Sequence, residues 1–73
     1  MTNKEMYQMF IEFWLKHGLT KEEVKDKLMN NAPFFTIQDL KFNLKYPNSI
    51  KDKEIEKDYR EKLEVLIELR DNL

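Results

Sequence analysis

The chain has 73 residues, with 13 Lys and Arg against 14 Asp and Glu, so its formal net charge is −1. It contains no cysteine, so neither a disulfide nor a thiolate-bound metal can support its core, and this absence fits a reducing compartment. The near-neutral balance supplies no global positive field for nucleic acid. One glycine and two prolines leave few turn residues, which favours helices in a single small domain covering 1–73.

The first expected helix, over residues 3–17, is apolar around most of its circumference. At 100° per residue, its apolar side chains from Met6 to Leu15 cover roughly 240°, against about 100° or somewhat more on an ordinary surface helix. We therefore predict that the other segments, or another chain, cover it on more than one side. The run is interrupted by Glu12 and has no small-residue cleavage site after it, which argues against a secretion signal, and it is too short to span a bilayer, so a cytoplasmic protein is expected.

Two boundary signals separate this helix from the next. His17 followed by Gly18 is typical of a helix end, because glycine readily adopts the left-handed conformation that follows a last turn. Thr20 and Glu23 have the spacing of a capping box, in which each side chain binds the other residue's backbone N–H. These signals predict a second helix over 21–30.

Residues 34–46 carry two conflicting patterns. Thr36 and Asp39 repeat the capping-box spacing, which predicts a short helix over 37–45. Strict alternation of apolar and polar residues along the second half of the segment is instead typical of a strand. We favour the helix, and the alternative is an α+β fold with a short strand or hairpin at 34–46.

The last helix is expected over 50–72, with Ser49 as its cap. Its first half is nearly all charged, whereas its second half carries an apolar stripe that includes Leu66, Leu69 and Leu73. Two longer and two short helices predict an all-α fold, a compact bundle of four helices.

No residue set suited to catalysis or metal binding is evident. His17 is the only histidine and Ser49 the only serine, and nothing in the sequence places them together. One histidine without cysteine does not make a structural zinc site, and a single glycine does not make a phosphate-binding loop. We therefore expect no enzyme, no cofactor, no metal and no small-molecule substrate.

The favoured function is that of a protein–protein interaction module. Its size, and an amino-acid usage that resembles that of AT-rich genomes, suggest a small bacterial or phage-encoded regulator or inhibitor that binds and occludes a partner. A homodimer would cover the apolar first helix most economically. The expected partner-binding residues are large apolar side chains, which are enriched at interface centres: Trp14, Phe34, Phe35, Leu66, Leu69 and Leu73.

The alternative function is that of a small DNA-binding regulator. A helix-turn-helix-like segment around 38–45 would present polar side chains to bases or phosphates, namely Gln38, Lys41, Asn43 and Lys45. The same segment interleaves basic and aromatic residues, as proteins that bind single strands do. A membrane-surface role is not expected, because the narrow polar face of 3–17 is not basic.

Overall fold

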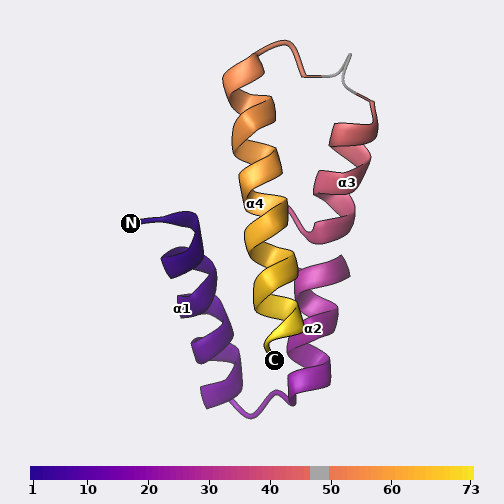
Figure 1. Cartoon of the computed structure of the whole chain (residues 1–73). Helices are drawn as coiled ribbons and strands as arrows, with labels where there is room; N and C mark the ends of the chain where they lie inside the picture. The colour runs from indigo at the N-terminus through magenta and orange to yellow at the C-terminus, as the bar shows by residue number, and fades with distance from the viewer. Residues whose placement is uncertain (47–49) are drawn as a thin grey trace.

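The computed structural model describes residues 1–46 and 50–73. Its helices are α1 (Asn3–Lys16), α2 (Lys21–Asn30), α3 (Ile37–Lys45) and α4 (Lys53–Asp71), and these described ranges contain no strand (Figure 1). The predicted all-α bundle of four helices is confirmed, and the segment with two conflicting patterns is helical.

The central helix is α4. α1 lies along one side of it, while α2 and α3 follow one another along the other side (Figure 1). α4 packs against each of the other three helices, whereas α1 packs mainly against α2 and α4. The result is an elongated molecule of 40 × 23 × 19 Å.

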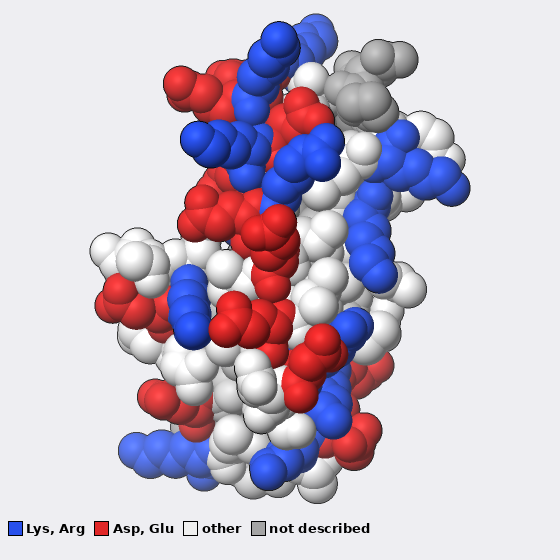
Figure 2. Space-filling model, viewed as in Figure 1, with Lys and Arg blue, Asp and Glu red and all other residues white. Residues whose placement is uncertain are grey.

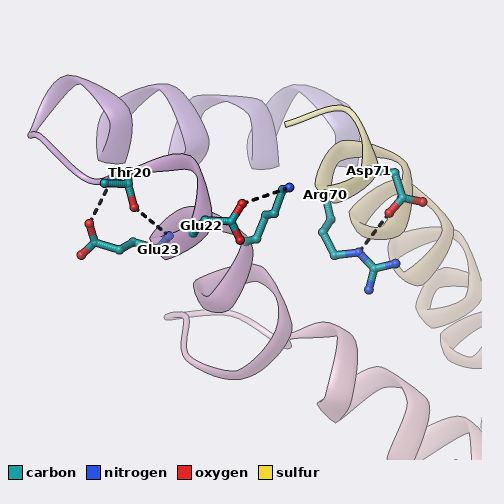
Figure 3. Close-up of polar contacts among 6 residues, drawn as sticks. Thr20, Glu22, Glu23, Arg70 and Asp71 are labelled. Carbon is teal, nitrogen blue, oxygen red and sulfur yellow. Dashed lines mark hydrogen bonds and ion pairs between the residues drawn. The ribbon is translucent and has the colours of Figure 1, made fainter.

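Both predicted capping boxes are present. At the start of α2, the Thr20 N–H donates to Glu23 Oε1 at 3.0 Å and the Glu23 N–H donates to Thr20 Oγ1 at 3.2 Å (Figure 3). The bond from the Thr20 N–H stabilises the carboxylate and lowers the pKa of Glu23. Thr36 and Asp39 make the same pair of bonds at the start of α3, at 3.1 and 3.3 Å. These bonds satisfy N–H groups that have no partner within the helix.

The end of α1 also follows its sequence signal. His17 caps the helix, and Gly18 follows with φ +93°, in the region that residues with a side chain rarely adopt. At the other end of the helix, Thr2 is the cap, and its side chain accepts a bond from the Glu5 N–H. Glycine at this turn lets the chain reverse directly into α2.

The alternation in α3 arises from one buried and one exposed face. Ile37 and Leu40 are buried, and Leu44 is half-buried on the same side. Phe42 and Tyr46 instead lie on the outer side and are exposed. The apolar positions that mimic a strand therefore belong to two different faces of one helix, and the capping box decides the local structure.

The last helix begins later than predicted. It starts at Lys53 rather than at residue 50, because the Asp52 side chain accepts a bond from the Glu54 N–H at 2.9 Å and serves as the cap. Ile50 precedes the helix. The cap predicted at Ser49 lies outside the described residues.

The core forms where the C-terminal half of α4 meets the other helices. Leu66 lies there with 0% of its surface exposed. The buried apolar residues are Tyr7, Ile11, Trp14, Val24, Leu28, Ile37, Leu40, Leu66 and Leu69. All four helices contribute to this set, and α4 rather than α1 is the helix around which they pack.

The chain's own segments cover α1 on one side only, so that part of the prediction is wrong, and coverage of α1 by another chain stays a prediction. Only one face of the helix is buried, through Tyr7, Ile11 and Trp14. Met9 and Phe13 are 55% and 56% exposed. Short α2 and a single stripe on α4 together cover one face of α1, so the remaining apolar side chains of α1 point outward.

Tyr7 is a core residue whose phenol interacts electrostatically with an acidic residue of α4. Its ring lies 4.9 Å from the Phe34 ring, centroid to centroid, and the residue is buried. Burial, together with the smaller effect of the nearby Asp58 carboxylate, raises the pKa of Tyr7 to about 12. The folded protein therefore favours the neutral phenol.

This raised pKa predicts a loss of stability at high pH that depends on Tyr7. The folded state holds the proton up to about 12, whereas an unfolded tyrosine releases it near 10, so the stabilisation is present below pH 10 and is lost as the pH rises through 12. The free energy of unfolding should decrease at high pH, partly because the lysines lose their charge. We expect Tyr7→Phe to abolish the remaining part of this decrease. Urea unfolding of both proteins between pH 8 and 12 measures it, and parallel curves would contradict the assignment.

Candidate protein-binding surface

Three of the predicted partner-binding residues lie in the core. Trp14, Leu66 and Leu69 are buried, and Leu73 is half-buried against the same cluster. The heptad spacing of Leu66 and Leu73 reflects packing of α4 within its own chain. The partner-binding patch expected on these four residues is therefore largely buried in the folded protein.

The two adjacent phenylalanines point to different surroundings. Phe34 is half-buried, with its ring 5.1 Å from the Phe10 ring. Phe35 is exposed and meets Tyr59 edge-on, with ring centroids 5.4 Å apart. Of the pair, Phe35 has the larger outward surface.

The residues of the nucleic-acid alternative lie on α3. Gln38, Lys41 and Lys45 are exposed on one face, while Asn43 is half-buried and donates its amide to the Asp39 carbonyl at 2.8 Å. Lysine and arginine side chains gather over α3 and the beginning of α4, with acidic side chains along the front of α4 (Figure 2). The face is mixed rather than strongly basic.

An apolar feature of the surface that the predicted site residues did not include is the α1 strip. It consists of Met1, Met6, Met9, Phe10 and Phe13, which together line an open hollow of about 320 Å³. The last four residues recur at positions i, i+3, i+4 and i+7, so they form one continuous stripe along the helix. No charged side chain lines the hollow.

The core fixes the orientation of the strip. Phe10 is half-buried, with its ring 5.7 Å from the Trp14 ring, so the inner edge of the strip is continuous with the core. At the outer edge, the Phe13 ring lies 4.3 Å from the His17 ring. The strip is thus an extension of the core onto the surface.

Charged residues flank the strip on one side. At 100° per residue, Glu5, Glu12 and Lys16 fall on the same flank, and all three are exposed. Glu5 accepts a bond from the Thr2 hydroxyl at 3.0 Å. Within the described residues, neither Glu12 nor Lys16 forms an ion pair. The flank is therefore acidic near the start of α1 and basic at its end.

The described residues offer no metal-binding group of three or more His, Cys, Asp or Glu side chains. Among the described helices, none is both long and apolar enough to cross a bilayer. The chemistry that the α1 strip provides is apolar contact with a charged rim, which suits recognition of another macromolecule.

Comparison of the chain with protein-family models, with curated proteins and with solved structures finds no match. The chemistry of the surface must therefore support the functional proposal by itself.

The sequence did contain a signal for the strip. An apolar arc of roughly 240° exceeds what one buried face requires, so part of it had to remain outside unless other segments surrounded the helix. The arc alone does not tell which part faces the core. Trp14 looks like an exposed anchor by residue type, yet it points inward, while Met9 and Phe13 point outward.

Proposed function

We propose that this protein is a non-enzymatic protein-interaction module that binds through the α1 strip. The observation that carries the proposal is the apolar hollow of about 320 Å³ on the outer side of α1. Large exposed apolar patches on soluble proteins mark interaction sites. Three of its five lining residues are methionines, whose flexible side chains adapt to a partner's shape.

The spacing within the strip favours a helical partner. Anchors at i, i+3, i+4 and i+7 are those with which one amphipathic helix packs on another. The carboxylates of Glu5 and Glu12 on the flank favour a basic group on the partner beside its apolar face. Acting in the cytoplasm as a small regulator or inhibitor, the protein would occlude the partner surface that it covers, and self-association into a homodimer uses the same chemistry.

The proposal predicts that two charges placed in the strip abolish partner binding without unfolding the protein. Met9→Asp with Phe13→Asp removes two outward-facing anchors, so we expect helical peptides selected by display against the wild type to lose at least about tenfold in affinity. Fluorescence anisotropy measures the affinity, and a thermal melt checks the fold.

The matched control is Phe42→Asp with Ile55→Asp, which places two aspartates at side chains 64% and 45% exposed on other helices. This control should bind the selected peptides like the wild type. Selection that yields no strip-dependent helix, or equal losses in both double variants, would contradict the proposal.

A second candidate function, nucleic-acid binding, rests on the outer face of α3. The rings of Phe42 and Tyr46 are both exposed and lie 5.0 Å apart, and Lys45 Nζ lies 5.8 Å from the Tyr46 ring centroid. Lys41 is exposed one turn of the helix before Lys45. Aromatic rings beside lysines can stack on bases and contact phosphates.

Because α3 carries only a few lysines, it can neutralise only a few phosphates. We therefore expect duplex DNA to bind no more tightly than the non-specific range of about 10⁻⁴–10⁻⁶ M at physiological salt. Anisotropy titrations with labelled duplex and single-stranded oligonucleotides at several salt concentrations measure this. A salt-sensitive nanomolar complex that Lys41→Ala with Lys45→Ala abolishes would favour the second function over the first.

A further inference from the structure

We infer that the α1 strip pairs with the strip of a second copy of this chain, with the two α1 helices antiparallel across a two-fold axis. The inference rests on the proposed function and names one partner for it. A two-fold pair buries the same patch on both copies, so a single apolar strip covers itself. α1 is itself an amphipathic helix with anchors at i, i+3, i+4 and i+7, the chemistry that the strip favours in a partner.

The register follows from the positions of the anchors. The middle of the stripe lies between Met9 and Phe10. A two-fold axis passing there places Met6 opposite the partner's Phe13, and Met9 opposite the partner's Phe10. Met6 and Met9 then each pack on a ring, a contact that sulfur and aromatic groups favour.

The charges on the flank distinguish the antiparallel pair from a parallel one. In an antiparallel two-fold pair, the same flank of both helices lies on the same side. Glu5 then lies alongside the partner's Lys16, offset by about 3 Å along the axis, which long side chains can span. The arrangement repeats by symmetry, which gives two pairs of opposite charge. In a parallel pair this flank would instead face the opposite flank of the partner, which carries Asn3 and His17.

Glu12 is the remaining charge on this flank. It lies further round the helix from the strip than Glu5 or Lys16, and four residues before Lys16, where opposite charges on one helix attract. In this register Glu12 also lies about 3 Å along the axis from the partner's Glu5 and opposes the Glu5–Lys16 attraction, but its greater distance from the strip makes this effect the smaller one. The antiparallel direction also sets the two helix dipoles in the favourable orientation.

The size of the strip sets the expected affinity. α1 has 14 residues, so its length is about 21 Å. One face of such a helix supplies less than the roughly 800 Å² per partner of a standard interface. The dimer should therefore be weak, with a dissociation constant on the order of 10–100 µM.

Sedimentation velocity over a concentration series tests the inference through a charge swap. Glu5→Lys and Lys16→Glu should each weaken the dimer about fivefold to tenfold, because each turns two attractive pairs into repulsive ones. The double variant, Glu5→Lys with Lys16→Glu, should recover wild-type affinity. Glu12→Lys is the matched control, with the same charge change on the same flank, and it should not weaken the dimer.

Cysteine cross-linking tests the direction of the pair, since the chain has no native cysteine. In the inferred register, oxidation of a mixture of Met6→Cys and Phe13→Cys chains gives a mixed disulfide dimer, whereas neither variant alone cross-links to itself. A parallel pair predicts the reverse, because each residue would then meet its own copy within disulfide range. Thermal melts of every variant verify that it folds.

A wild type that stays monomeric at millimolar concentration overturns the inference, as does a dimer in which the double swap fails to restore affinity. Strip-dependent binding of helical peptides to a strictly monomeric protein would overturn self-pairing while leaving the proposed function intact. A dimer that Met9→Asp with Phe13→Asp does not affect would overturn the assignment of self-pairing to the strip.

Discussion

The packing of the other three helices against α4 is the interaction on which the structure depends. A domain of this size buries only about 60% of the surface that its unfolded chain exposes, so it can build one small core. Leu66 is the fully buried residue of α4 in that core. α1 shares this stripe with α2 and α3, and α1 is therefore covered on one face only. The outward strip on α1 is a direct consequence of where the core forms.

The outward position of the strip links the stability of the fold to the proposed function. Met9 and Phe13 add little to the stability of the isolated chain, because more than half of each remains in water. Full burial of such a side chain is favourable by about 1.5–3 kcal/mol. A partner that covers these residues would therefore gain binding free energy. The flanking charges of Glu5 and Lys16 add direction to an attraction that is otherwise non-directional.

Local signals in the sequence predicted most of the fold. The pairs Thr20–Glu23 and Thr36–Asp39 each fix the start of a helix through bonds between residues three apart, so no knowledge of distant contacts is needed. The orientation of α1 depends instead on tertiary packing, since an apolar arc of roughly 240° offers several equivalent faces. For this reason Trp14 and Leu66 were predicted at a surface and lie in the core. The α1 strip could be inferred as a surplus of apolar residues, but its members could not be chosen.

Comparing Leu66→Ala with Phe13→Ala by urea unfolding tests the central claim most directly. We expect Leu66→Ala to lower the free energy of unfolding by about 2–5 kcal/mol, as removal of a buried leucine does, and so to unfold much of a small domain. Phe13→Ala should change it by no more than about 0.5–1 kcal/mol, the usual effect at an exposed position. Low micromolar protein keeps self-association from contributing. A larger loss for Phe13→Ala than for Leu66→Ala would show that α1, and not α4, carries the core.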